Sequence, residues 1–393
     1  MADPSSQIWF EDGLFLSCAT GDDPAGCVFS SYARYVSVIP RVLVAVVAIF
    51  PPAVAGTVIV TLAILVTAVA AGFVTASARR LGLPIWASAA VGLAIALLPD
   101  AGAETIGVLV NLQWVLGYAA MWVLLPYSQA TTRLRAGSEA GLTALAALTA
   151  PGTIALIPIV AVRWATGRKR GQDRANYLAA PIALTVGVLI QVIVYLASPN
   201  SPQVGPPETT PLSQRLTYFD GFLRSVTFGT ANVARSDIWF LASGIAFVLC
   251  FWLLWRNRAR PELRTAGLLI GLCALTSFGL TAALRDPAPF RFWVNLGLVF
   301  FSLLVVTVAA TVTYTPVTKV ALGAAGAGLL LLWVAAFPIG NVRVATSYSW
   351  PAQVSEAAMR CRNEPGLTGV SIRVGPDFFV PAGLRYPCRY LTR

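Results

Sequence analysis

Two adjacent acids near the start of the chain, Glu11 and Asp12, are the residues best suited to chemistry. They stand among Trp9, Phe10 and Leu14, so a carboxylate here could lie partly desolvated against a membrane surface and accept a proton. The chain has no histidine, the commonest proton shuttle and metal ligand at neutral pH. Acid–base chemistry therefore rests on Asp or Glu. A solvated surface loop would use the same acidic pair, and that alternative stays open.

A second polar group interrupts an otherwise apolar stretch, at Glu104, Asn111, Gln113 and Trp114. Glu104 and Asn111 are seven positions apart, which predicts that they share one face of a helix. Polar side chains inside a membrane are costly and usually face a cavity or a neighbouring helix. We therefore expect these residues to line a pocket, with hydrogen bonding between helices as the alternative.

Four arginines at the ends of apolar stretches would suit a phosphate group: Arg34, Arg41, Arg285 and Arg291. A guanidinium group binds phosphate oxygens in a bidentate fork. The alternative for each of them is to extend along the membrane surface toward lipid headgroups.

The composition decides the class of protein that must position these groups. Of the 393 residues, 57% are hydrophobic and 11% are charged, whereas soluble domains carry about a quarter charged residues. This excludes a soluble enzyme, a disordered chain and a fibrous repeat. An all-α polytopic membrane protein with about 9–10 transmembrane helices is predicted. The expected spans are 54–78, 84–98, 104–125, a broken helical hairpin at 138–165, 176–198, 238–255, 265–284, 291–312 and 318–338.

The basic residues predict which side of the membrane each loop occupies. Half of the 28 Lys and Arg residues stand in five short loops between these spans, which the positive-inside rule assigns to the cytoplasm. The sides alternate correctly if Ala150-Pro151-Gly152 breaks the 138–165 stretch into two half-helices. The sequence pI near 9.8 thus reflects topology, and no nucleic acid is expected as a partner.

Three regions follow from this map. Residues 1–53 hold the acidic motif and an interfacial helix at 36–50, residues 54–338 form the bundle with an outer loop at 199–237, and residues 339–393 form a small outer appendage. The alternative is that 36–50 spans the membrane, which would place the acidic motif in the cytoplasm. Each outer region has two cysteines, which predicts the local disulfides Cys18–Cys27 and Cys361–Cys388. A bridge between the two regions stays open. No metal site is expected, because neither pair has zinc-ligand spacing.

The polar motifs also resemble a known family. The segment 9–16 followed by 35–41 resembles the first outer loop of bacterial GT-C-type membrane glycosyltransferases, of the kind found in actinobacteria. Segments 104–114 and 148–152 are similar as well, and Arg291-Phe292 stands where such proteins often have an Arg-Tyr pair. The motifs are short, and we expect no spanning helix before the acidic motif, although that family usually has one; a first helix missing from this sequence is the alternative.

The resemblance implies an inverting glycosyltransferase of the bacterial plasma membrane. Such an enzyme moves a monosaccharide from a polyprenyl-phosphate donor to a glycan or glycolipid acceptor of the cell envelope, on the outer face among membrane lipids. Asp12 would be the base, with Glu11 as its partner or as the base itself. Arg41 and Arg291, with Arg34 and Arg285 nearby, would neutralise the donor phosphate. The substrate pocket would be lined by Glu104, Asn111, Gln113 and Trp114. No cofactor is required, although a divalent cation could bind at Glu11 and Asp12.

Other functions use the same features. A transporter or flippase of lipid-linked sugars would place its substrate at the broken hairpin 138–165. An O-antigen-type polymerase would depend on the outer arginines. A non-catalytic scaffold subunit would need neither the acids nor the arginines.

Overall fold

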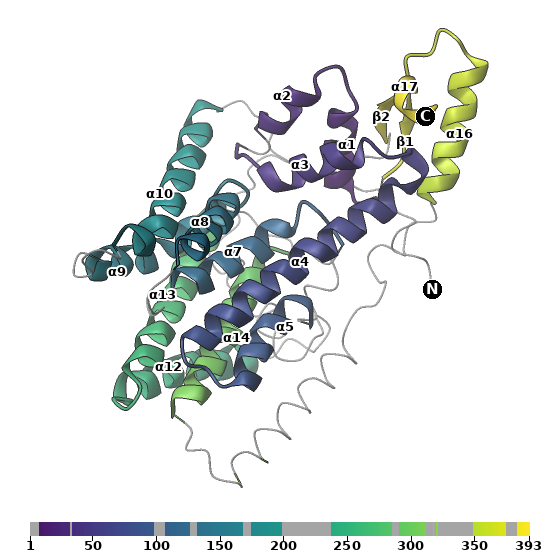
Figure 1. Ribbon diagram of the computed structural model, residues 1–393. Helices are drawn as coiled ribbons and strands as arrows, with labels where there is room; N and C mark the ends of the chain where they lie inside the picture. Colours follow the sequence, from purple (N-terminus) through teal and green to yellow (C-terminus); the bar gives the residue numbers. More distant parts are fainter. Residues whose placement is uncertain are drawn as a thin grey trace.

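The computed structural model describes residues 8–31, 34–97, 107–125, 132–167, 174–198, 237–284, 291–311, 317, 320, 349–374 and 383–393. Helices dominate this part of the chain (Figure 1). The α-helices are α1 (Phe10–Ala19), α2 (Pro24–Phe29), α3 (Val38–Val47), α4 (Ala55–Arg80), α5 (Ile85–Leu97), α7 (Leu112–Leu124), α8 (Arg133–Ala147), α9 (Ile157–Gly167), α10 (Arg174–Ala197), α12 (Asp237–Arg256), α13 (Pro261–Leu284), α14 (Arg291–Thr311), α16 (Trp350–Asn363) and α17 (Cys388–Leu391). Two 3-10 helices, η2 (Pro52–Val54) and η3 (Pro151–Leu156), and an antiparallel pair of strands, β1 (Gly369–Ile372) and β2 (Leu384–Pro387), complete the description.

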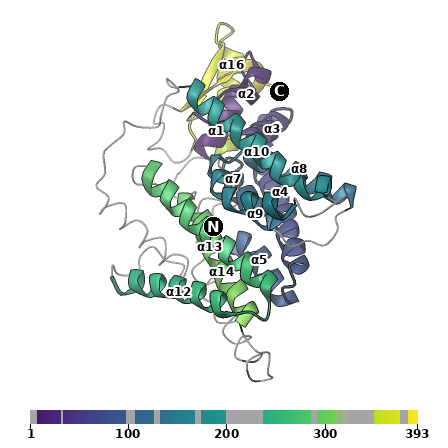
Figure 2. The same ribbon diagram turned by 90° about the vertical axis from the view of Figure 1, so that its left-hand side faces the viewer.

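The helices from α4 to α14 form a bundle around α7 (Figures 1 and 2). Helix α4 packs on α5 and α7, α8 packs on α7 and α10, and α14 packs on α5, α7 and α13. Every residue of α7 except Trp114 is buried, which marks it as the centre of the bundle. Small residues let helices approach closely: a side chain at Gly187 of α10 would overlap Ala147 of α8.

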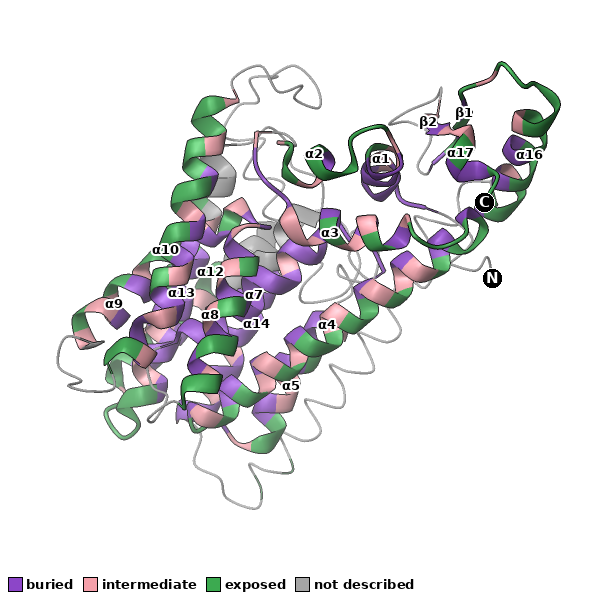
Figure 3. Ribbon diagram, turned by 45° about the horizontal axis from the view of Figure 1, so that its top comes forward, coloured by how far each residue is buried: buried purple, intermediate pink, exposed green. Residues whose placement is uncertain are grey.

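Two of the described helical stretches are long and apolar enough to cross a membrane by length and composition, Pro52–Arg80 and α10. The other apolar helices in the described ranges, including α5 and α7, are shorter. Buried residues face the centre of the bundle, while exposed residues run along the outer sides of α4 and α10 (Figure 3). The prediction of a mostly helical, apolar fold is confirmed at this level, and the number of spans stays a prediction.

The hairpin predicted at 138–165 is broken where the sequence indicated. Helix α8 ends at Ala147, Pro151 opens the 3-10 helix η3, and α9 continues from Ile157. Proline lacks the backbone N–H that a continuing helix would need, so the hydrogen-bond ladder stops at this point.

The prediction of one helix over 104–125 is wrong at its start. Helix α7 begins at Leu112, and residues 107–111 before it are not helical. Gly107 has a φ of 73°, a left-handed conformation that a continuous α-helix cannot contain. Asn111 is therefore the residue that precedes the helix, and the predicted face running from Glu104 through Asn111 does not form as one helical stripe.

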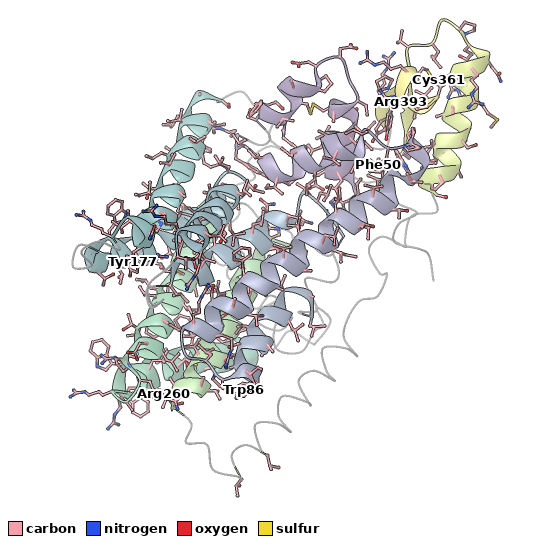
Figure 4. The ribbon with its side chains drawn as sticks, viewed as in Figure 1. Phe50, Trp86, Tyr177, Arg260, Cys361 and Arg393 are labelled. Carbon is pink, nitrogen blue, oxygen red and sulfur yellow. A yellow bond between two sulfur atoms is a disulfide. The ribbon has the colours of Figure 1, made fainter. Side chains whose placement is uncertain are left out.

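The N-terminal helices and the C-terminal tail pack together at one end of the bundle, where η2 leads into α4 (Figure 1). The indole N–H of Trp350 in α16 donates to the carbonyl oxygen of Pro52 (2.7 Å), and Arg393 donates to that of Ala48 (3.2 Å). Figure 4 labels Arg393 and Phe50 at this junction. The tail is thus a cap on the N-terminal helices.

Two local disulfides stabilise this layer, Cys18–Cys27 between α1 and α2 and Cys361–Cys388 between α16 and α17. This is the local pairing, so the alternative bridge between the two regions is absent. The tail departs from the all-α prediction, because β1 and β2 form a two-stranded sheet with Gly369 opposite Pro387. The loop 199–236, the span 318–338 apart from residue 320, Glu104 and Arg285 lie outside the described residues.

Candidate active site

The acidic pair lies in the first turn of α1, at the end of the bundle covered by the tail. Helix α1 begins at Phe10, and acids in a first turn are favoured there by the positive end of the helix dipole. Both acids are buried, with relative exposures of 3% for Glu11 and 0% for Asp12. A buried carboxylate must be hydrogen-bonded or paired, so the surroundings of each acid determine its role.

The carboxylate of Asp12 binds the turn that leads into α7. The backbone N–H of Val110 donates to Oδ1 (2.9 Å), and the N–H of Leu109 donates to Oδ2 (3.0 Å). The positive φ of Gly107 belongs to this same turn, and the positive end of α7 follows it. Asp12 thus holds a segment almost a hundred residues away, and N–H donors face both of its oxygens.

Glu11 lies one position earlier on α1, about 100° around the helix from Asp12. Its side chain is buried as well, and Ile8 and Trp9, which precede it along the chain, belong to the apolar core cluster. Within the described ranges, no group of three His, Cys, Asp or Glu side chains could hold a metal ion. The N–H donors that face both oxygens of Asp12 are a poor surrounding for a cation, so its carboxylate does not favour the predicted divalent-cation site.

Arg41 of α3 is buried and is directed toward α2. Its guanidinium group donates to the carbonyl oxygen of Cys27 and is hydrogen-bonded to the hydroxyl group of Ser30, while it lies 4.7 Å from the ring centre of Phe15. These contacts connect α1, α2 and α3. Arg41 therefore stabilises the packing of these three helices, whether or not it also binds a ligand.

Arg34 lies beside the C-terminal end of α10 and is partly exposed. Its guanidinium group donates to the carbonyl oxygen of Tyr195 (3.1 Å) and stacks over the Tyr195 ring at 4.0 Å. Its backbone has a φ of 67°, which is uncommon for a residue with a side chain. Of the predicted arginines whose side chains are described, Arg34 is the one that reaches the surface. Arg291 is the first residue of α14, and its side chain is not among those described.

The polar residues at the start of α7 follow directly on the turn that Asp12 holds. Asn111 and Gln113 are buried and Trp114 is half-buried. The amides of Leu109 and Val110 thus fix the position of these three residues relative to the acidic pair.

The hairpin break reaches the same layer through two backbone contacts. The N–H of Val38 donates to the carbonyl oxygen of Leu148 (3.2 Å), and the N–H of Ile39 donates to the hydroxyl group of Thr149 (3.2 Å). All four segments singled out in the sequence (9–16, 35–41, 104–114 and 148–152) therefore have described residues that meet at one end of the bundle.

No family model, curated protein or solved structure matches this chain.

The structure adds a residue to this layer that the sequence motifs did not include. Gln191 of α10 is buried; its side-chain amide donates to the carbonyl oxygens of Val36 (2.9 Å) and Ala147 (3.0 Å), and its oxygen accepts from the N–H of Val36 (2.9 Å). A lone glutamine in the apolar run of α10 was the available signal, because polar groups in such runs usually bind a neighbour.

The tail completes the enclosure of α1. The hydroxyl group of Tyr386 donates to the carbonyl oxygen of Gly13 (2.9 Å), next to Asp12. Burial raises the pKa of Tyr386 well above its ordinary value, and the neighbouring Tyr390 raises it further. The acidic pair is therefore surrounded by backbone donors, aromatic rings and the cap, an arrangement that could shield a proton-transfer step from water.

Proposed function

We propose that this chain is a multi-pass protein of the bacterial plasma membrane and an inverting GT-C-type glycosyltransferase. The active site is at the outer end of the bundle. The donor is a polyprenyl-phosphate monosaccharide, and the acceptor is a hydroxyl group of an envelope glycan or glycolipid. The observation that carries the proposal is the convergence of the four motif segments around two buried carboxylates.

Exposed apolar side chains support insertion into a membrane. Large aliphatic and aromatic residues are exposed along the outer faces of several helices: Leu65 and Val69 of α4, Ile193 and Leu196 of α10, and Val248 and Trp252 of α12. Soluble monomers rarely expose contiguous apolar patches of this kind, whereas lipid chains would cover them. The positive-inside rule, applied to the basic loops, would place the acidic pair outside.

Glu11 is the better candidate for the base. Both oxygens of Asp12 accept backbone N–H groups, which suits a residue that positions the turn before α7. Glu11 would take the proton of the acceptor hydroxyl while the hydroxyl oxygen forms a bond to the anomeric carbon of the sugar. The bond from that carbon to the phosphate oxygen breaks on the opposite face, and polyprenyl phosphate leaves with the configuration inverted.

The departing phosphate gains negative charge, which arginine side chains can stabilise. Arg34 is partly exposed at the outer end of α10, where a lipid-linked phosphate would arrive. Arg291 opens α14 and is the second candidate. Asn111, Gln113 and Trp114 would contact the sugar or the acceptor from the start of α7.

The test is sugar transfer by the full chain in lipid vesicles supplied with polyprenyl-phosphate monosaccharides. Glu11→Gln is expected to lower the rate by about 10²–10⁴-fold, the usual contribution of a general base, with an unchanged melting temperature. The matched control is Glu356→Gln, which changes an exposed glutamate of α16. If folded Glu11→Gln and Asp12→Asn variants both transfer sugar at the wild-type rate, the transferase proposal is wrong.

The same vesicles separate the alternatives. A polymerase would lose activity in Arg34→Gln and Arg291→Gln but keep it in both acid variants. A flippase would move a lipid-linked sugar across the vesicle membrane without an acceptor and without transfer.

A further inference from the structure

A second polar site lies at the opposite end of the bundle, where α4 and α7 end and α8 begins. A small hollow that opens to solvent is lined there by Ser77, Arg80, Trp122, Val123 and Arg135, with leucine side chains beside them. Helix α4 has 26 residues, so this hollow lies about 39 Å from the acidic pair's end of the helix. It is a separate place from the candidate active site.

Positive charge exceeds negative charge in the wall of this hollow. Arg135 Nε lies 2.8 Å and Arg80 Nη2 lies 3.3 Å from the same oxygen of Glu139. The side chain of Glu139 is only 3% exposed, whereas those of Arg80 and Arg135 are 29% and 23% exposed. One carboxylate thus neutralises one of two guanidinium groups, and both arginines remain reachable from outside.

Two N–H donors of these arginines are not used by the described residues. Arg80 Nε and Arg135 Nη2 are buried and have no hydrogen-bond partner among them. Buried charged donors without an acceptor are unfavourable, so these two atoms favour an anion in the hollow.

A third arginine supports the wall from behind. Arg163 of α9 is buried; it donates to the carbonyl oxygen of Val123 (3.1 Å) and to that of Tyr177, and it lies 4.5 Å from the centre of the Tyr177 ring. Figure 4 labels Tyr177 at this end of the molecule. These bonds fix the last turn of α7, so specific contacts hold the backbone that forms this wall of the hollow.

We propose that this hollow binds a phosphate group, either as the headgroup of an anionic phospholipid or as free phosphate. Two guanidinium groups that share one carboxylate match a singly charged phosphate ester in charge and in donor geometry. Trp122, Leu81 and Leu125 are buried behind the hollow, so the phosphate group is the part of the ligand that the hollow would recognise. The basic loops assign this end to the cytoplasmic leaflet, where anionic phospholipids reside. Sugar transfer is not required for this binding.

The experiment is native mass spectrometry of the full chain with phosphatidylglycerol and, separately, with phosphatidylcholine. Phosphatidylglycerol is expected to remain bound to the wild type, and Arg135→Gln should weaken it about tenfold, the effect of losing one charge-assisted hydrogen bond. Arg133→Gln is the matched control, because Arg133 is exposed in the same helix and does not line the hollow.

A second variant keeps both arginines and so separates binding from folding. Ser77→Asp would place a carboxylate beside Arg80 and is expected to exclude the lipid phosphate while the protein stays folded. Displacement of the lipid by inorganic phosphate would indicate that the phosphate group alone is recognised; retention of the lipid would indicate that the acyl chains contribute. Equal binding by the wild type, Arg135→Gln and Ser77→Asp would overturn the proposal, as would an equal loss in Arg133→Gln.

Discussion

Carboxylates are buried at both ends of the bundle, but their partners differ. At the end covered by the tail, Asp12 binds two backbone N–H groups and Arg41 binds a backbone carbonyl oxygen and the Ser30 hydroxyl group. At the opposite end, Glu139 binds two arginine side chains. The first kind of contact fixes the path of the chain, and the second fixes the packing of helix surfaces.

This difference indicates different tasks. A charged side chain that binds backbone groups cannot change its partners unless the bound segment moves. Such a contact suits a site whose parts come from distant places in the sequence. When two guanidinium groups share one carboxylate, some of their N–H donors have no acceptor. Such an arrangement suits the reversible binding of an anion. Substitutions at each end can test whether this comparison holds.

The largest effect is expected for Asp12→Ala. The substitution leaves the buried N–H groups of Leu109 and Val110 without their acceptor, which should lower the free energy of unfolding by about 4 kcal/mol. Denaturant unfolding of the protein in detergent measures this. Asp22→Ala, at a side chain that is 99% exposed, should have little effect. Equal stability of the two variants would show that Asp12 does not hold the turn before α7.

A smaller loss is expected for Glu139→Gln at the opposite end. The two arginines lose their counter-charge, but both are partly exposed, so the cost should be about 2 kcal/mol. Glu364 makes an i,i+4 pair with Arg360 just as Glu139 does with Arg135, but this pair is more than half exposed. Glu364→Gln should therefore cost less than about 0.5 kcal/mol. Similar costs in both variants would mean that burial does not distinguish the two pairs.

The sequence predicted those features of the fold that depend on local composition. Apolar stretches at 54–78 and 176–198 became α4 and α10, Pro151 ended the first half of the hairpin, and each cysteine pair closed a short loop. Each of these outcomes follows from hydropathy, proline geometry or proximity along the chain.

The partners of the polar residues could not be predicted in the same way. Asp12 and Val110 are 98 positions apart, and Gln191 and Val36 are 155 apart, so only the packed bundle brings them together. The basic residues Arg80 and Arg135 looked like topological signals, because the sequence does not show that Glu139 lies buried between them. The helix over 104–125 was extended too far, since hydropathy does not detect a turn held by a distant carboxylate.

Alanine substitutions at two glycines test how tightly the chain packs at each end of the bundle. A Cβ atom at Gly13 would lie 2.8 Å from Val374 Cγ1 and 3.3 Å from the Tyr386 hydroxyl oxygen, so Gly13→Ala should push the tail away at a cost of about 1.5 kcal/mol. Gly137 of α8 has no atom within 4 Å of such a position, and Gly137→Ala should stabilise the helix by about 0.5–1 kcal/mol. Limited proteolysis of the tail, together with melting temperatures, measures both effects. A destabilised Gly137→Ala variant, or a Gly13→Ala variant with an undisturbed tail, would contradict this interpretation of the packing.

A smaller loss of stability than for Gly13→Ala is expected at neutral pH for Tyr386→Phe, which removes the hydrogen bond to the Gly13 carbonyl oxygen and should cost about 1 kcal/mol. At high pH this residue should act differently. Burial raises the pKa of Tyr386 and Tyr390 in the folded tail above the ordinary value of 10.0, so both stay protonated there while the unfolded chain loses the protons.

Stability should therefore be constant below about pH 10 and fall above it, by about 1.4 kcal/mol per pH unit for each tyrosine. Melting curves of the wild type and Tyr386→Phe between pH 8 and 11 (a range set by the ordinary tyrosine pKa of about 10) would measure this. The variant should lose one of the two contributions, so its decline should be shallower and the two curves should converge as the pH rises. Parallel curves would mean that Tyr386 is not buried against α1, and the tail would then not enclose the acidic pair.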